Sequence, residues 1–394
     1  MNSTKHSPEN TPVIVSCCRT AIGRSDLAEG VFRKVRGDEL CAFVVKEAVS
    51  RGCVSPEHIE EVVVGVTQQR GELGGNVARS ISLLAGLPFS AAASTTNRLC
   101  GSSLQGVAQA CHSIMAGAED VHVVAGVEHM QHLPMDSEID FHPRAFANSC
   151  RAVLSMGLTA EYLAASYGIG RRSQEEYVLE SHRRAVHATE TGFFKKEIVA
   201  CPGLNMHGVF TLVDRDQSIR SDTSLDSMGR LSPAFLPKIG SVTAATSAPL
   251  SDGAAAMVVM SEAAARRYGL TPLVRVVGTA VVGVSPALMG LGPVYATRKV
   301  LRRSGLRLQE IEIVELNEAF AVQAMACINE LELDHEIVNV HGGSLAIGHP
   351  LGASGVRIAT TLIHTMRDRH ARLGLATMCI GFGQGIAVVF ELIE

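Results

Sequence analysis

The chain has 394 residues, 46% of them hydrophobic and 19% charged, and its 35 Lys and Arg against 39 Asp and Glu give a formal net charge of -4. This length supports two or three domains with a large core. The near-neutral balance and the absence of a long basic run exclude a broad surface for nucleic acid. No apolar run reaches the roughly 20 residues that a membrane span needs. We therefore expect neither a nucleic-acid partner nor a membrane partner.

The ten cysteines show neither CxxC pairs nor the regular spacing of a small secreted disulfide framework. They predict reduced thiols. Residues 1–12 lack the apolar segment of a secretory signal and the Arg-rich pattern of a transit peptide. The ending Glu391-Leu392-Ile393-Glu394 is not a peroxisomal signal. These features predict a cytoplasmic protein.

The two ends of the chain share one pattern of predicted elements. Residues 45–65 predict a helix, a glycine and an apolar strand, and residues 297–315 predict the same order. In both copies a Gly/Ser-rich loop then leads into a long helix, near Cys100 in the first and near Gly352 in the second. A further apolar strand follows each helix, at residues 121–125 and 375–380. Strands that alternate with helices indicate βαβ modules, so we expect an α/β fold with two duplicated modules and mainly parallel sheets.

Residues 128–238 interrupt this pattern with helical and irregular polar stretches. We interpret them as an inserted loop domain that forms a lid or a substrate platform. The N-terminal module then comprises residues 1–127 with about 239–270, and the C-terminal module comprises residues 271–394. Sheets of this kind bind ligands in the crevice beyond the strand ends. Two facing modules would therefore bring their loop–helix junctions to a shared crevice.

Cys100 stands in the stretch NRLCGSS, where the first of these long helices begins. A helix start has N–H groups without intrahelical partners and a partial positive charge. We therefore expect the pKa of the Cys100 thiol to fall below its usual value of about 8.5. An isolated cysteine is more often a small buried hydrophobe, so this placement alone does not establish a nucleophile.

Three further residues could act with this thiol. His349 lies in the glycine-rich stretch GGSLAIGHPLGASG, Cys379 follows a buried strand in CIGFGQG, and Asn317 follows a strand in NEAF. An imidazole can accept a proton from a thiol, and a second thiol can exchange one. Asn317 could cap a helix or hold a water molecule in the site. The wide spacing of Cys and His disfavours a zinc site, and no phosphate-binding GxxxxGK[ST] loop is present.

Together these four stretches, in this order, resemble the thiolase family. The resemblance runs from about Thr11 to the C-terminus. The shorter stretches VEHM, MGLTAE, MGLGP and ATMC are similar to the bacterial 3-ketoacyl-CoA thiolases of fatty-acid β-oxidation. The resemblance implies a five-layer α/β/α/β/α fold with an inserted loop domain.

The resemblance also implies the reaction and the catalytic residues. CoA would cleave a 3-ketoacyl-CoA to acetyl-CoA and a shortened acyl-CoA by reversible Claisen chemistry. Cys100 would give its proton to His349 and attack C3, forming an acyl-enzyme. Cys379 would protonate the departing enolate and then activate CoA. One oxyanion pocket would be His349 with a water held by Asn317, and the other the backbone N–H groups of Cys100 and Gly381.

For substrate contacts, the resemblance implies that Arg220 lies by the CoA nucleotide and Ser247 by the pantetheine. Relatives usually have Gly at the position of Ala245, Ser at that of Ala248 and an acid at that of Gln217, so the sequence departs from the family there. CoA is a substrate, and the resemblance implies no cofactor or metal. It implies a homodimer or homotetramer, and a possible partner with hydratase and dehydrogenase activities.

Three other functions remain open from the sequence. A biosynthetic acetoacetyl-CoA thiolase uses the same residues in the opposite direction. A ketosynthase shares the fold class but uses two histidines, and Cys379 argues against it. A non-catalytic acyl-CoA-binding relative would have lost the chemistry, although Cys100, His349 and Cys379 are all present. Measuring activity against 3-ketoacyl-CoAs of increasing chain length distinguishes these functions.

Overall fold

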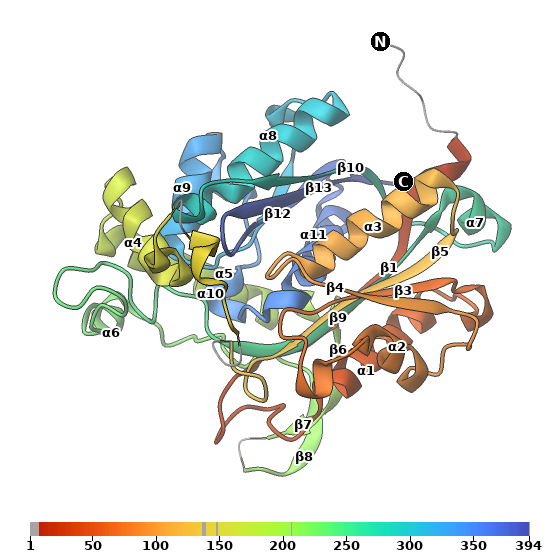
Figure 1. Cartoon of the computed structure of the whole chain (residues 1–394), viewed down its shortest axis with the longest axis horizontal. Helices are drawn as coiled ribbons and strands as arrows, with labels where there is room; N and C mark the ends of the chain where they lie inside the picture. Colours follow the sequence, from red (N-terminus) through yellow and green to blue (C-terminus); the bar gives the residue numbers. More distant parts are fainter. Residues whose placement is uncertain (1–7, 136–138, 147–148, 206, 394) are drawn as a thin grey trace.

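The computed structural model describes residues 8–135, 139–146, 149–205 and 207–393, and its element order repeats in two halves (Figure 1). The first half contains β1 (Pro12–Thr20), β2 (Gly23–Arg24), α1 (Gly37–Arg51), β3 (Glu61–Gly65), α2 (Val77–Leu84), β4 (Ala92–Thr96), α3 (Ser102–Ala116), β5 (Val121–His129), β9 (Ser251–Ser261) and α7 (Glu262–Arg267). The second half contains β10 (Val274–Gly283), α8 (Gly292–Ser304), β11 (Ile313–Leu316), α9 (Ala321–Leu331), α10 (Ser344–Ile347), α11 (Ser354–Arg369), β12 (Leu373–Ile380) and β13 (Gln384–Leu392).

The segment between β5 and β9 carries its own elements. These are α4 (Met156–Tyr167), α5 (Arg171–Glu190), β6 (Ile198–Val199), β7 (Cys201–Leu204), β8 (Phe210–Val213) and α6 (Leu225–Gly229). The helices α4 and α5 lie beside α9, and the β7–β8 hairpin projects at the bottom of the view (Figure 1). This segment therefore covers one side of the second half and leaves a separate hairpin at the surface.

Apart from the separate β7–β8 pair, the described strands form one continuous sheet, which we divide at its short β1–β10 junction into an N-terminal and a C-terminal sheet. The N-terminal sheet has the order β4-β3-β5-β9-β1, and the C-terminal sheet has the order β10-β13-β12-β11. β1 and β10 pair only through Val13 with Arg275 and Ile14 with Val274. Since the junction is this short, helices can fit between the two sheets.

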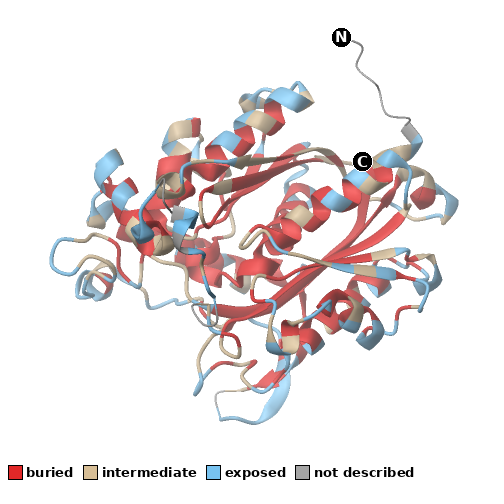
Figure 2. Cartoon of the chain, viewed as in Figure 1, coloured by how far each residue is buried: buried red, intermediate tan, exposed pale blue. Residues whose placement is uncertain are grey.

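Helices fill the space between the sheets and cover both outer faces. α1 and α2 pack on the outside of the N-terminal sheet, α3 and α11 lie side by side between the sheets, and α8 and α9 pack outside the C-terminal sheet (Figure 1). This five-layer α/β/α/β/α arrangement confirms the predicted fold class. Figure 2 shows α11 and the central strands as almost continuously buried. The two halves therefore share the central helical layer.

Small residues allow the two central helices to approach closely. A Cβ at Gly355 of α11 would lie 2.4 Å from the backbone nitrogen of Leu104 in α3. A Cβ at Gly126 of β5 would lie 2.5 Å from the carbonyl oxygen of Gly352, just before α11. No side chain separates the halves at these two glycines, so the loops at the starts of α3 and α11 come close together.

The prediction of mainly parallel sheets was wrong. Among the described strands, β3 runs parallel to β4 and β5, β11 to β12, and the short β6 to β1. The pairs β5–β9, β9–β1, β1–β10, β10–β13 and β13–β12 are antiparallel. β12 and β13 are joined by the turn at residues 381–383, and so short a connection only permits an antiparallel pair. Within the described residues, we find no helix with the length and apolarity that crossing a bilayer requires.

Candidate active site

The candidate site forms where matching loops of the two halves meet. Cys100 precedes α3 by two residues, and His349 lies just before α11. Cys379 lies near the end of β12, and Gly381 follows in the turn. These four residues line one cavity of about 110 Å³. The structure thus brings together the nucleophile candidate and both predicted proton-transfer partners, which come from different halves of the chain.

The backbone at Cys100 has an unusual conformation. Leu99, directly before it, has φ +46, a left-handed value that non-glycine residues rarely adopt. The Ser102 hydroxyl stabilises this turn, because it donates to the carbonyl of Leu99 at 2.5 Å and accepts from the N–H of Arg98 at 2.9 Å. A Cβ at Gly101 would lie 2.5 Å from the side chain of Ile380, so a larger residue after Cys100 would require that side chain to move. Local strain of this kind is found at functional sites.

The expected lowering of the Cys100 pKa was wrong. Burial raises the pKa of this thiol to about 11, and the backbone N–H of Gly381, which stabilises the thiolate, offsets burial only in part. α3 begins at Ser102, beyond Cys100, so the thiol does not occupy the first turn of the helix. Cys100 is therefore a neutral thiol at physiological pH and needs a base when it attacks.

His349 is suited to act as that base. Its imidazole is buried, and burial followed by the positive charge of Arg357 lowers its pKa to about 3. The ring is therefore neutral at physiological pH and has a free lone pair. Its Nδ1 lies 2.7 Å from Ser354 Oγ, and its Nε2 lies 3.4 Å from the side-chain nitrogen of Asn317. Asn317 therefore lies beside His349, and the predicted water between them stays a prediction.

Cys379 is the more deeply buried of the two thiols. Burial and, next, the neighbouring Cys100 raise its pKa well above the ordinary value. The turn after it includes Phe382 with φ +61 and Gly383 with φ +84. A Cβ at Gly383 would lie 2.3 Å from the carbonyl oxygen of Val284, which requires glycine there. This turn directs the N–H of Gly381 toward Cys100, and the raised pKa keeps the Cys379 thiol protonated at physiological pH.

Several residues around these groups escaped the sequence analysis. Ser354 contacts His349 directly at 2.7 Å, and Ser344 contacts Asn317 at 2.6 Å. Ser344 and Ser354 stand within the glycine-rich stretch around His349, but a serine in such a loop is usually a turn residue. The rest of the cavity wall is apolar and consists of Met130, Met135, Met156, Ala248, Pro249, Leu250, Met289, Ala319, Phe320 and Leu351.

A second cavity of about 210 Å³ adjoins the first. The two share Cys100, Met135, Met156, Leu351 and Gly381 in their walls. The remaining wall of the second cavity comprises Thr67, Gln68, Leu99, Ile139, Phe141, Leu154 and Phe382. An apolar space thus extends from the Cys100 thiol, away from the wall formed by Ala248 and Pro249.

The two residues expected to contact CoA lie outside the first cavity. Arg220 is exposed, and its backbone N–H donates to Nδ1 of His182 at 3.2 Å. Ser247 donates to the carbonyl of Thr243 at 2.8 Å, while its neighbour Ala248 lines the cavity. The structure therefore does not bring Arg220 and Ser247 into the catalytic cluster.

The departure at Gln217 has a structural reason. Its side-chain oxygen accepts from the N–H groups of Arg24 and Val31, and its nitrogen donates to the carbonyl of Glu29 at 2.7 Å. A carboxylate could not make the last contact, because it has no hydrogen to donate. The preceding Asp216 instead holds the buried Arg19 through two contacts of 2.7 and 2.9 Å.

The fold and the site define a class of protein: a duplicated five-layer α/β protein with two thiols and an imidazole in one cavity between its halves. Family models give the particular family. Residues 12–263 match the model described as "Thiolase, N-terminal domain", and residues 270–392 match "Thiolase, C-terminal domain". The chain belongs to the thiolase family.

Individual proteins agree with this assignment. The chain is 48% identical to a 3-ketoacyl-CoA thiolase of Pseudoalteromonas translucida over 98% of its own length and 100% of that protein. Its structure is similar to human mitochondrial 3-ketoacyl-CoA thiolase, with a TM-score of 0.90 and 34% identity over 98% of this chain and 100% of that one. It is also similar to a Bacillus anthracis acetyl-CoA acetyltransferase, with a TM-score of 0.88 and 36% identity over 97% and 99% of the two chains.

Proposed function

We propose that this enzyme cleaves 3-ketoacyl-CoA with CoA, giving acetyl-CoA and an acyl-CoA that is two carbons shorter. The observation that carries the proposal is the single cavity in which Cys100, His349 and Cys379 meet. Near-full-length similarity to a 3-ketoacyl-CoA thiolase supports the same substrate. The chemistry needs one nucleophile and two proton-transfer groups, and the cavity supplies all three.

The first half of the reaction follows from the protonation states. Cys100 gives its proton to Nε2 of His349 as its sulfur attacks C3 of the substrate. The C2–C3 bond then breaks, its electron pair moves to C2, and the resulting acetyl-CoA enolate takes the proton of Cys379. The product is an acyl group on Cys100, with the extra proton on His349 and a thiolate at Cys379. The N–H of Gly381 stabilises negative charge beside Cys100, and the Asn317–His349 pair lies where a second oxyanion can be stabilised.

The second half restores the enzyme. The Cys379 thiolate takes the proton of an incoming CoA thiol, and the CoA sulfur attacks the acyl carbon. Cys100 leaves as a thiolate and takes its proton back from His349. All protons return to their starting atoms, so the cycle consumes only substrate and CoA. We accordingly propose that the reaction needs no resident cofactor or metal.

The second cavity supports substrates longer than four carbons. Its apolar wall of Leu99, Ile139, Leu154 and Phe382 continues from the Cys100 thiol, where the acyl group is held. A biosynthetic acetoacetyl-CoA thiolase would need space for an acetyl group only. We therefore favour degradation of fatty acyl chains, and we propose that CoA enters past Ala248 and Pro249, with Ser247 beside the pantetheine and Arg220 beside the nucleotide.

The test is kcat/KM for CoA-dependent cleavage across 3-ketoacyl-CoAs, from the four-carbon substrate to long chains. We expect cleavage, with a higher kcat/KM for chains that fill the second cavity. Activity confined to the four-carbon substrate would instead establish the biosynthetic alternative. If no chain length is cleaved while acyl-CoA still binds, the chain is a non-catalytic acyl-CoA-binding protein.

We also propose a homodimer or homotetramer in the cytoplasm. Strand β4 stands at one end of the sheet order, and the exposed Leu83 and Leu84 lie at the end of the neighbouring α2. The ten cysteines include no CxxC pair and no secreted-type spacing, which supports a reducing compartment. Association with a hydratase and dehydrogenase protein of β-oxidation stays a prediction from the family resemblance, and co-purification from the native cell tests it.

A further inference from the structure

Arg357 of α11 is a buried cation with few partners. The residue has no exposed surface, and its Nη1 lies 3.8 Å from the buried Glu315. Neither oxygen of Glu315 accepts a hydrogen bond, and the Arg357 Nε and Nη1 atoms make none, among the described residues. Burying a loosely paired charge is costly, so an ion pair of this kind is a poor stabilising device. Such a group calls for an explanation in terms of function.

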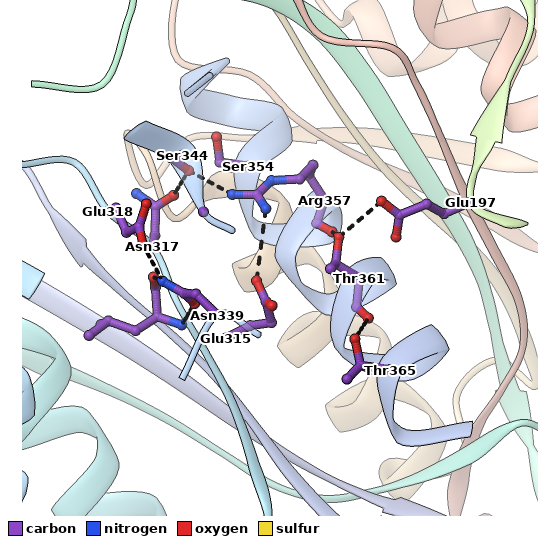
Figure 3. A network of polar contacts seen from close by, with 12 residues as sticks. Glu197, Glu315, Asn317, Glu318, Asn339, Ser344, Ser354, Arg357, Thr361 and Thr365 are labelled. Carbon is purple, nitrogen blue, oxygen red and sulfur yellow. Dashed lines mark hydrogen bonds and ion pairs between the residues drawn. The ribbon is translucent and has the colours of Figure 1, made fainter. Parts of the chain in front are cut away.

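Within the part of the chain that the structure describes, the guanidinium makes one hydrogen bond, and it leads toward the active site. Arg357 Nη2 lies 2.6 Å from Ser344 Oγ, and Ser344 Oγ lies 2.6 Å from Asn317 Oδ1 (Figure 3). Figure 3 shows Arg357, Ser344 and Asn317 in one continuous line. The line continues to His349, because Asn317 Nδ2 lies 3.4 Å from His349 Nε2.

This line of contacts can run in one direction only. A guanidinium has hydrogens to donate and no lone pair that accepts, so the Ser344 oxygen must accept from Arg357. The Ser344 hydrogen is then available for Asn317, which must present its carbonyl oxygen on that side. The Asn317 amino group consequently faces His349. Since an amino group donates, it disfavours a hydrogen on His349 Nε2.

The opposite face of the imidazole agrees with this direction. His349 Nδ1 lies 2.7 Å from Ser354 Oγ, close enough for an N–H to donate to the hydroxyl oxygen. The neutral ring then carries its hydrogen on Nδ1 and a lone pair on Nε2. The contact of 3.4 Å to Asn317 is long, so this lone pair stays available to the Cys100 proton.

We propose that Arg357 is a positioning residue: acting through Ser344, it fixes the orientation of the Asn317 amide and thereby keeps Nε2 of His349 as the proton acceptor for Cys100. The inference rests on the proposed function for its kinetic consequence. It explains why a cation is buried beside a base that must stay neutral. A guanidinium donates and has no acceptor, so its end of the line cannot be reversed.

The kinetic test compares three single variants of the full-length enzyme. Ser344→Ala breaks the line but leaves Arg357 and Glu315 in place. Arg357→Lys retains a cation that only donates, whereas Arg357→Gln introduces an amide that can donate or accept. Thr365→Val is the matched control, because Thr365 is buried on the same helix and its hydroxyl donates only to the carbonyl of Thr361.

The readout is the rate of acetylation of Cys100 by acetyl-CoA as a function of pH, with acetyl-enzyme quantified by mass. For Ser344→Ala and Arg357→Gln we expect a loss of about 10²-fold near neutral pH. We also expect the acid limb of their pH–rate profiles to move to higher pH. The Asn317 amide, once released, can turn its oxygen toward Nε2 of His349 and so favour the protonated ring. Arg357→Lys should recover part of the rate, and the control should match the wild type. An unchanged pH profile in Ser344→Ala would overturn the proposal.

A second readout does not depend on any Ser344 or Arg357 variant. Long-range 15N–1H correlation spectra of histidine-labelled wild-type enzyme report which ring nitrogen carries hydrogen, and loss of one signal in His349→Gln identifies the ring. We expect His349 with hydrogen on Nδ1 only. Hydrogen on Nε2 in an enzyme that cleaves substrate refutes the positioning role alone, whereas the expected tautomer in an enzyme that cleaves no substrate refutes the proposed function alone.

Discussion

The site places two thiols and one imidazole in an apolar cavity, and burial acts on them in opposite senses. It raises the pKa of Cys100 and of Cys379 and lowers the pKa of His349, because in each case it disfavours the charged form. All three groups are therefore neutral before substrate binds. The proton transfers must then occur together with the bond changes. No permanent thiolate–imidazolium pair then has to be kept in an apolar cavity.

The pH dependence of Cys100 alkylation tests this view. With its pKa near 11, the thiolate fraction at physiological pH is small and rises about tenfold for each pH unit. We expect the rate of iodoacetamide labelling at Cys100 to keep rising with pH through the alkaline range. The exposed Cys53 and Cys150 would also react, so peptide mapping and the Cys100→Ala variant provide the correction. A plateau at or below neutral pH would instead indicate a preformed thiolate–imidazolium pair.

Cys379→Ala should separate the two chemical steps. Acetyl transfer from acetyl-CoA to Cys100 needs His349 but no proton at C2, so we expect it to survive. Cleavage and formation of the C2–C3 bond need the Cys379 proton and should fall by about 10³-fold. Cys327→Ala is the control, since that thiol is buried and donates to the carbonyl of Gly290 instead of lining the cavity. Equal loss of both steps would contradict the assigned role.

At the scale of elements, the meeting of α3 and α11 determines the distance between nucleophile and base. Each helix follows the loop that carries one of them, and Gly355 of α11 contacts Leu104 of α3 without a side chain between. The Ser103 hydroxyl also accepts from the N–H of Val356 at 3.0 Å. The buried Glu128 joins the halves again, because it accepts from the N–H groups of Gln68 and Gly352.

Gly355→Ala should therefore damage both stability and activity. Alanine is favoured over glycine in a helix by about 1 kcal/mol, but its Cβ would lie 2.4 Å from the Leu104 nitrogen. We expect a net destabilisation of about 1–3 kcal/mol from overpacking, with a lower Tm and a reduced kcat because the helices separate. Gly283→Ala is the control, as nothing lies within 4 Å of its added Cβ. A wild-type Tm and kcat for Gly355→Ala would show that the contact can relax.

How far the sequence predicts the site depends on the kind of residue. Cys100, His349 and Cys379 could be found because glycines mark the loops that carry them. Arg357 could not, because the sequence does not show that an arginine in a helix is fully buried. The prediction of a lowered Cys100 pKa was wrong for a similar reason. The sequence indicates the nearby helix start, but the burial of the thiol depends on residues from both halves. The prediction of parallel strands was wrong where a short turn or a long insertion reverses the direction of the chain.

At the scale of the whole molecule, the active site exists only when the two halves pack together. The Arg98 side chain, next to the nucleophile loop, donates to Gln384 of the last strand at 3.0 Å, and the Cys100 cavity takes walls from both halves. Duplication explains why both halves contribute to the cavity. The same loop–helix junction carries the proposed nucleophile in one copy and the proposed base in the other. The first sheet, however, ends at β4, where a further strand can add.

We expect this edge to form a homodimer. Leu84, which lies at the end of α2 beside β4, is 55% exposed in the single chain, and apolar side chains beside an open edge favour pairing with a second copy. Light scattering coupled to size exclusion should give at least twice the mass of one chain. Leu84→Asp should weaken association by about tenfold or more, since it buries a charge at the interface. Leu212→Asp, on the β7–β8 hairpin and 63% exposed, is the control and should leave association unchanged. A monomeric wild type, or equal effects of the two substitutions, would rule out this edge as the interface.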